Sequence, residues 1–304
     1  MNSNAERILE TVAGFRQLPE GAFNIRHNGK GVNLRNSPGI SIIPRKDGKG
    51  ITVKVKPGTV GEVMHIPVVI DQSGIIDLVY NDFFIGEDCD IEIMAGCGIH
   101  NDGLHLTQHD GIHTFHIGRN SRVRYVEKHY GSGGTAKKVL NPVTNLYLAE
   151  GAYMEMDTVQ IEGVDTTKRV TNAKLLEKAT LVVKEKLLTS GNQTATTDYE
   201  IDLDGCGAGV NLVSRSVAKG SSMQEFLSKI NGNNECHGHS ECDAIIMDNA
   251  VVTAIPVVRA NHVDASLIHA AAIGKIAGEQ ITKLLTLGLT QEEAEAEIVN
   301  GFLR

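Results

Sequence analysis

The chain has 304 residues, with 37 Asp and Glu residues against 29 Lys and Arg residues, and a formal net charge of −8 at pH 7. This acidic balance argues against a nucleic-acid partner held through phosphate contacts. The densest apolar stretch, residues 250–258, is too short to cross a bilayer, so we expect no membrane insertion. With five cysteines and no secretory signal pattern, we expect a soluble cytoplasmic protein without a disulfide framework.

The first segment, residues 1–38, is predicted to form a short helix followed by an arm. Ser3 and Glu6 have the spacing of a capping box. Apolar residues then recur on one helical face at Ile8, Leu9 and Val12. Gly14 and Pro19 are expected to end the helix.

Residues 39–263 have the pattern of a strand-rich core. Residues 51–56 and 153–157 alternate between apolar and polar side chains, as half-buried strands do. A faint repeat begins at successive apolar residues separated by 32, 31, 28 and 27 positions: Ile85, Ile117, Leu148, Leu176 and Leu203. This period favours a solenoid of stacked parallel strands, with a pair of β-sandwiches as the alternative.

The last segment, residues 264–304, is predicted to be helical. Ile281, Leu284 and Leu285 share one face of a helix that Gly288 is placed to end. Thr290 and Glu293 then form a second capping-box pattern before another helix. Two helices here could cap the open end of a solenoid, bind a partner, or do both.

Thiol and imidazole side chains are concentrated in residues 235–242, which read Glu-Cys-His-Gly-His-Ser-Glu-Cys. These groups suit zinc, iron or an iron–sulfur unit. The spacing does not match a standard zinc knuckle. If Cys242 begins a strand, it shares a face with Ala244 and Ile246, while Asp243 and Ile245 face the other way. The alternative is a buried structural thiol.

A second cluster contains Cys97 and a run of histidines: His100, His105, His109, His113, His116 and, further on, His129. The simplest interpretation is a polar outer face on stacked coils. The alternatives are a transient iron site, or a metallohydrolase that also uses Asp102 or Asp110. On a strand, His109 and His113 would share one face, whereas His113 and His116 would not. No P-loop is present, so we expect no nucleotide bound to this chain itself.

Three segments together resemble the SufB/SufD family of iron–sulfur cluster assembly proteins. They are residues 241–246, Glu-Cys-Asp-Ala-Ile-Ile; residues 268–276, Ile-His-Ala-Ala-Ala-Ile-Gly-Lys-Ile; and the closing residues 288–302. The resemblance implies a right-handed parallel β-helix with helical ends. The short chain looks like the compact, single-gene SufB-like branch of the family.

The resemblance also implies a site. Cys242 stands where SufB carries the cysteine that anchors a nascent iron–sulfur cluster. His269 stands where SufB and SufD carry a histidine near the subunit interface. The glutamates that flank the SufB histidine are Ile268 and Ala270 here, so no carboxylate ligand carries over from those positions, and Glu235, Glu241 and Asp264 are the substitutes left open. Cys236 is a further candidate ligand, and Glu241 is the candidate carboxylate. A homodimer would present Cys242 of one chain to His269 of the other, and a paralogous SufB or SufD subunit is the alternative partner.

We therefore expect a non-enzymatic scaffold for a transient iron–sulfur cluster, with a sulfur donor and recipient apo-proteins as further partners. The resemblance implies that a SufC-type ABC ATPase binds the closing helices. The candidate contact residues are Gln280, Leu284, Leu287, Thr290, Glu293 and Phe302. The alternatives are a metal-dependent enzyme that uses the His100–His116 run, and a purely structural adaptor of the ATPase.

Overall fold

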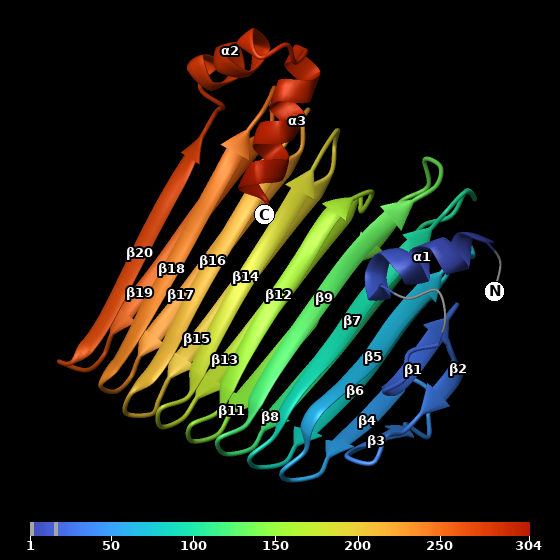
Figure 1. Ribbon diagram of the computed structural model, residues 1–304, viewed down its shortest axis with the longest axis vertical. Coiled ribbons are helices and arrows are strands. Elements are labelled where there is room, and N and C mark those ends of the chain that lie inside the picture. The colour runs from blue at the N-terminus through green and yellow to red at the C-terminus, as the bar shows by residue number, and fades with distance from the viewer. Residues whose placement is uncertain (1–2, 15–17) are drawn as a thin grey trace.

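The protein is a mainly β solenoid of about eight turns, with one helix near the N-terminus and two at the C-terminus (Figure 1). The computed structural model describes residues 3–14 and 18–304. Stacked parallel strands were the favoured prediction, and the solenoid is confirmed. No helix among these described residues combines the length and the apolar run that crossing a bilayer would require.

The strands and helices follow one another in a regular order. Their bounds are α1 Ser3–Ala13, β1 Ala22–His27, β2 Lys30–Arg35, β3 Ile40–Pro44, β4 Gly50–Val55, β5 Val60–Ile70, β6 Ile76–Ile85, β7 Asp90–His100, β8 Thr107–Ile117, β9 Arg122–Ser132, β10 Lys138–Leu140, β11 Val143–Leu148, β12 Tyr153–Glu162, β13 Thr166–Leu175, β14 Thr180–Thr189, β15 Thr194–Leu203, β16 Ala208–Ala218, β17 Met223–Gly232, β18 Cys236–Ile246, β19 Val251–Ala260, β20 Ala265–Gly274, α2 Gly278–Thr286 and α3 Gln291–Phe302.

Two long sheets face each other across the interior. The first runs β2-β1-β5-β7-β9-β12-β14-β16-β18-β20, and the second runs β19-β17-β15-β13-β10-β8-β6-β4-β3, with β11 also between β8 and β13. Each coil adds one strand to each sheet, and all pairs are parallel except the hairpins β1–β2 and β3–β4. Residues one coil apart in the sequence therefore lie side by side.

The sequence repeat corresponds to the strand register with one correction. Ile85, Ile117, Leu148 and Leu203 stand at equivalent positions in successive coils. The fourth member of this column is Leu175, and not the predicted Leu176. Leu175 points into the core, whereas the next residue begins the turn and is exposed. A one-residue shift moves a side chain to the other face of a strand, so the two leucines are not interchangeable.

One corner of the solenoid repeats a left-handed backbone conformation in six coils. The φ angles there lie between 54° and 74°, at Gly58, Asp88, Asn120, Gly151, Lys178 and Gly207. Each of these residues donates its N–H to a carbonyl of the next coil at 2.8–3.0 Å. Gly, Asn and Asp tolerate this conformation best, which explains why the turn residues recur with the coil period.

The N-terminal end of the solenoid is covered. The hairpins β1–β2 and β3–β4 end the two sheets, and α1 packs across β5, β7 and β9 (Figure 1). Ile8 and Val12 of α1 pack directly against the glycines of β7, where a Cβ added to Gly98 would clash with the side chain of Ile8. The apolar face predicted for this helix is buried, including Leu9.

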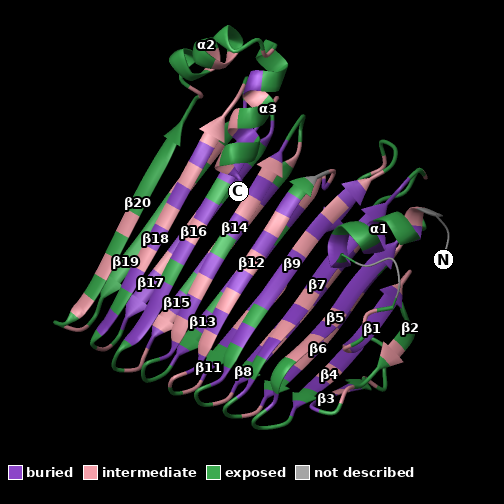
Figure 2. Ribbon diagram, in the orientation of Figure 1, coloured by how far each residue is buried: buried purple, intermediate pink, exposed green. Residues whose placement is uncertain are grey.

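The C-terminal end is open. Strands β19 and β20 are the last members of the two sheets, and most of their residues are exposed (Figure 2). The strands continue to Gly274, about one strand past residue 263, where the sequence pattern placed the end of the core. Beyond them, α3 packs its buried residues Ala294 and Val299 against the molecule, whereas α2 buries none.

Candidate functional site

Strand β18 carries the cysteine that the sequence singled out. The strand begins at Cys236 and not at Cys242, so Cys242 lies in its middle. The alternation is as expected: Cys242 and Ala244 point inward, while Asp243 and Ile245 are only partly covered. Only 1% of Cys242 is exposed, and it belongs to the main core cluster.

His269 lies on β20, the neighbouring strand. Its register partner on β18 is Ser240, and the partner of Cys242 is Ala271. Cys242 and His269 therefore face the same interior and are diagonal neighbours, with Cα atoms roughly 8 Å apart for strands about 4.8 Å apart with a rise of about 3.3 Å per residue. The ring atom Nδ1 of His269 is buried without a hydrogen-bond partner.

The other two candidate ligands lie elsewhere. Cys236 faces the interior, but it is six residues before Cys242 on the same strand and hence roughly 20 Å away. Glu241 lies on the outer face, 3.9 Å from His239 Nε2. A hydrogen bond with Asp243 raises the pKa of Glu241. One chain therefore brings together Cys242 and His269, but not Cys236 or Glu241.

Burial sets the protonation of this pair. It raises the pKa of the Cys242 thiol to about 12, and the nearby Glu185 carboxylate acts in the same direction. Burial also lowers the pKa of His269, helped by His239. A neutral thiol and a neutral imidazole follow at pH 7, and a bound metal would have to displace the thiol proton.

A column of polar side chains lies inside the first sheet and ends at Cys242. Register pairs link Glu127 to Thr158, Thr158 to Glu185, Glu185 to Ser214, and Ser214 to Cys242. The Ser214 hydroxyl donates to Glu185 at 2.7 Å. The sequence pattern does not reveal this column, because its members are about 30 residues apart and only the strand register aligns them.

The histidine run divides between the two faces of β8. His109 and His113 point inward, as their even spacing allows, while His116 is exposed between the stacked rings of Phe84 and Tyr147. The interpretation as a polar outer face therefore holds for His116 and is wrong for His109 and His113. The two inward imidazoles are tolerated in the interior because polar side chains from other coils form hydrogen bonds with them there.

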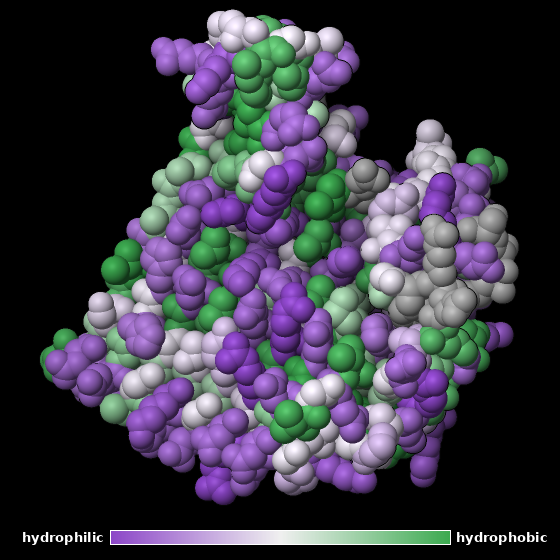
Figure 3. Space-filling view, viewed as in Figure 1, coloured by the Kyte–Doolittle hydropathy of each residue, from purple (hydrophilic) through white to green (hydrophobic). Residues whose placement is uncertain are grey.

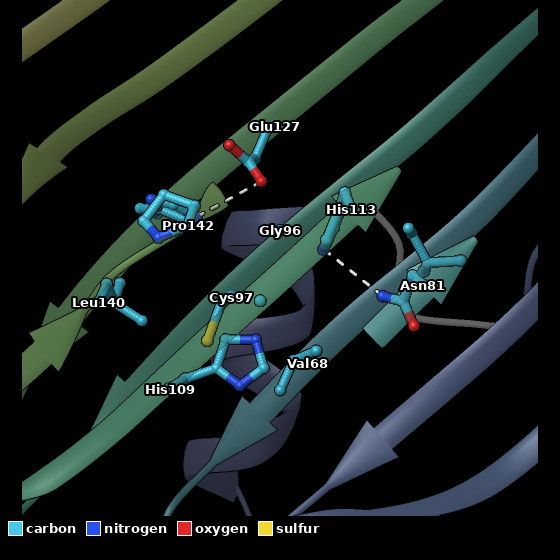
Figure 4. Close-up of a pocket in the computed structure, with 12 residues that line it drawn as sticks. Val68, Asn81, Gly96, Cys97, His109, His113, Glu127, Leu140 and Pro142 are labelled. Carbon is cyan, nitrogen blue, oxygen red and sulfur yellow. Dashed lines mark hydrogen bonds and ion pairs between the residues drawn. The ribbon is translucent and has the colours of Figure 1, made fainter. Parts of the chain in front are cut away.

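The inward histidines line a cavity of about 20 Å³ together with Cys97 and Glu127 (Figure 4). His109 Nδ1 is 3.1 Å from an Asp77 carboxylate oxygen. His113 Nδ1 donates to the Tyr125 hydroxyl at 3.0 Å, because that hydroxyl donates to Glu127. No group of three or more His, Cys, Asp or Glu side chains within residues 3–14 and 18–304 is arranged to hold a metal ion.

Buried charges fix the protonation of this cluster. Burial acts to raise the pKa of Glu127, but Arg169, with His129 and His113, holds that pKa well below its usual range. Arg169 contacts both Glu127 and Glu185, so it bridges the polar column. Burial lowers the pKa of His113 and His129 to about 4, which leaves both imidazoles neutral at pH 7.

The residues predicted to bind an ATPase lie in different environments on the C-terminal helices. Gln280 and Leu287 are exposed and Leu284 is half-buried. Phe302 instead packs against the small cluster around Val217. Thr290 and Glu293 form the predicted capping box at the start of α3, with the Thr290 N–H donating to Glu293 at 2.8 Å.

The neutral buried histidines predict that stability falls on mild acidification. In the unfolded chain a histidine titrates near about 6.5, so between about pH 6.5 and pH 4 the unfolded state binds protons that folded His113 and His129 do not. The free energy of unfolding should decrease across that window, and the low pKa of Glu127 adds a further loss only below about pH 4.5.

Urea denaturation of wild type and His129→Gln between pH 7 and pH 4.5 checks this. The variant should show a pH slope smaller by up to about one proton per molecule. The exposed His105 provides the control, because His105→Gln should keep the wild-type slope. Equal slopes in wild type and His129→Gln would contradict the prediction.

Comparison of the sequence with known proteins identifies a family and several relatives. Two overlapping segments, residues 107–242 and 176–302, match the family described as "SUF system FeS cluster assembly, SufBD core domain". An iron-sulfur cluster assembly SufBD family protein from Methanothermobacter thermautotrophicus is 26% identical over 261 residues, which cover 84% of this chain and 62% of that protein. A SufBD family protein from Archaeoglobus fulgidus is 27% identical over 228 residues, covering 74% of this chain and 60% of the relative.

The chain thus spans about 62% of the length of the first of these relatives. A third relative matches almost end to end. It is a SufBD family protein from Methanocaldococcus jannaschii, 25% identical over 321 residues that cover 98% of both chains. The family match extends over most of the solenoid and includes both Cys242 and His269. The chain belongs to the SufBD family of iron–sulfur cluster assembly proteins.

Proposed function

We propose that this protein is a non-enzymatic scaffold on which a transient iron–sulfur cluster is built at a subunit interface. The observation that carries the proposal is the pairing of Cys242 with His269. The two side chains face the same interior from adjacent strands at the open end of the solenoid. Family membership supports a role in iron–sulfur cluster assembly.

The donor set fits such a cargo. Thiolate and imidazole are ligands that iron in clusters accepts. His269 Nδ1 is a buried atom without a hydrogen-bond partner, so a bound iron would satisfy it. One thiolate and one imidazole from one chain leave other coordination positions on the iron open. Another chain, sulfide or a recipient protein can fill these positions. A cluster held in this way can be passed on, as a transient product must be.

The open end supports pairing with a second scaffold subunit. β19 and β20 are the end strands of the two sheets, each ten residues long, and within the described part of the chain each pairs on one side only, with β17 and β18 respectively. The exposed side chains of β19 include Ile255, Val257 and Val258. Long apolar edges invite pairing with another strand. We propose a second copy of the chain as the partner, with a paralogous SufB or SufD subunit as the alternative.

The C-terminal helices supply a surface for an ABC-type ATPase of the SufC kind. Helix α2 is amphipathic and buries no residue, and Leu287 is 70% exposed. Apolar side chains are visible on this helical projection at the top of Figure 3. Only residues 275–277 separate α2 from β20, so movement of the bound ATPase would be passed directly to the strand that carries His269.

Through this short connection, we propose, the ATPase controls access to the site. Cys242 is 1% exposed, so iron and sulfur reach it only if the last coil moves. In the proposed cycle, closure of the ATPase dimer displaces the last coil and uncovers Cys242. A sulfur donor and iron then load the site, and the cluster leaves to an apo-protein.

Anaerobic reconstitution with ferrous iron and sulfide tests the scaffold. Wild type should gain a brown chromophore with a roughly stoichiometric iron-to-sulfide ratio, and Cys242→Ser should lose it because the thiolate ligand is gone. Cys236→Ser is the matched control, since this cysteine lies on the same strand and the same face. A chromophore lost only in Cys236→Ser would move the site, and none in wild type would favour a structural adaptor.

Substitution on α2 tests the ATPase surface. Leu287→Asp should reduce capture of a SufC-type ATPase at least tenfold, because it puts a charge into an apolar contact. Pull-down and titration calorimetry measure this. Leu104→Asp is the control, since Leu104 is 94% exposed and lies far along the chain from α2. Unchanged capture by Leu287→Asp would exclude this face of α2.

A charge on the last edge strand tests the pairing. Ile255→Lys should shift the protein toward monomer in sedimentation velocity, because a lysine on an edge opposes strand pairing. Val60 is also exposed but lies on β5, so Val60→Lys should leave the distribution unchanged. If wild type is a monomer at all concentrations, the second-copy model fails and a paralogous subunit becomes the candidate.

A further inference from the structure

A serine lies between the two side chains of the Cys242–His269 pair. Ser240 is the register partner of His269, and it precedes Cys242 by two residues on the same inner face of β18. The side chain is fully buried, with 0% exposed. It therefore adjoins His269 across the strands and Cys242 along its own strand.

Ser240 is hydrogen-bonded across the interior of the solenoid. Its hydroxyl donates at 3.0 Å to Oγ of Ser228, which belongs to β17 in the opposite sheet. A hydroxyl donates one hydrogen bond and accepts up to two. The two serine hydroxyls together carry two protons, and one of these forms the hydrogen bond between them. If Ser228 donates to Ser240, the Ser240 proton is available to a new acceptor without any loss of the existing contact.

The other neighbours of Cys242 cannot offer this proton. Ser214 flanks Cys242 on β16, but its hydroxyl already donates to Glu185 at 2.7 Å. Ala271 flanks it on β20 and has no donor. Ser216 is a further buried hydroxyl on this face, but it is the register partner of Ala244 and lies on the side of Cys242 away from β20. The hydroxyl of Ser240 is thus the one that adjoins both members of the pair.

We propose that Ser240 is a positioning residue that donates a hydrogen bond to a sulfur atom of the nascent cluster, and that Ser228 supports it from the opposite sheet. This inference rests on the proposed function of Cys242 and His269. Hydrogen bonds to cluster sulfur withdraw charge from the iron and tune its potential and stability. When the Ser240 hydroxyl turns from Ser228 to the cluster, the Ser228 hydroxyl is free to donate to Ser240 in its place, and the two hydrogen bonds then polarise each other and strengthen the contact.

Reconstituted wild type and Ser240→Ala test the inference. The variant should keep the wild-type iron-to-sulfide ratio, because both ligands remain, but lose its cluster to a chelator about five- to tenfold faster. Resonance Raman spectra in H₂O and D₂O give a second readout. The Fe–S stretching bands of wild type should shift in D₂O, and this shift should be smaller in the variant. A merely structural role of Ser240 would not move it.

Ser222→Ala is the matched control. Ser222 is also fully buried and hydrogen-bonded to another hydroxyl, that of Thr189 at 2.9 Å, but it lies in the turn before β17. Ser240→Thr keeps the hydroxyl and should restore slow cluster loss, whereas the similarly shaped Ser240→Val should not. This second pair serves if Ser240→Ala fails to fold.

The outcomes separate the two proposals. A wild-type cluster whose decay and D₂O shift are the same in Ser240→Ala or Ser240→Val overturns the role of Ser240 alone. No cluster in wild type overturns the scaffold, and this inference with it. Faster loss in Ser222→Ala equal to that in Ser240→Ala would assign the effect to general loosening of the fold and also overturn the inference.

Discussion

Every feature of this protein depends on the in-register parallel stacking of its coils. Each strand pairs with the strand one coil away, so residues 27 to 32 positions apart become lateral neighbours. Pairing of this kind satisfies the backbone of every internal strand and builds two flat inner faces. Ser240 meets His269, and Ser214 meets Cys242, for the same reason that Ile85 meets Ile117.

The interior that this stacking creates is not uniformly apolar. Phe83 and Phe115 stack at 4.2 Å in the core, yet Glu127 and Arg169 are buried a few residues away. Burying charges is costly unless they are paired and hydrogen-bonded, and here each of them is. The polar column runs through the centre of the solenoid and ends at Cys242, which joins the buried charges to the candidate site through Ser214 and Glu185.

The two ends of the solenoid differ in how far they are covered. Two hairpins close the N-terminal end, with α1 on the outer face of the first sheet beside them, whereas β19 and β20 leave backbone edges and apolar side chains open at the other end. Solenoids commonly carry caps at their ends, and the uncovered end is the surface at which we propose that a second subunit binds. The candidate pair lies at this end, with His269 on the last strand, β20, and Cys242 on β18 beside it. The uncapped end thus leaves room for the proposed partner, and the candidate site lies close to the surface where that partner would bind.

The sequence by itself determined the local features: the coil repeat, the amphipathic first helix, the capping box at Thr290, the opposite faces of His113 and His116, and the motifs that resemble the SufB/SufD family. Periodicity and capping depend on neighbours a few residues away, which a sequence displays directly. Only the tertiary structure decided that Ser240 adjoins His269, that Glu241 points away from Cys242, and that the coil column passes through Leu175. Coil lengths vary by several residues, and a one-residue change of register exchanges the inner and outer faces of a strand, so pattern alone cannot set which residues meet.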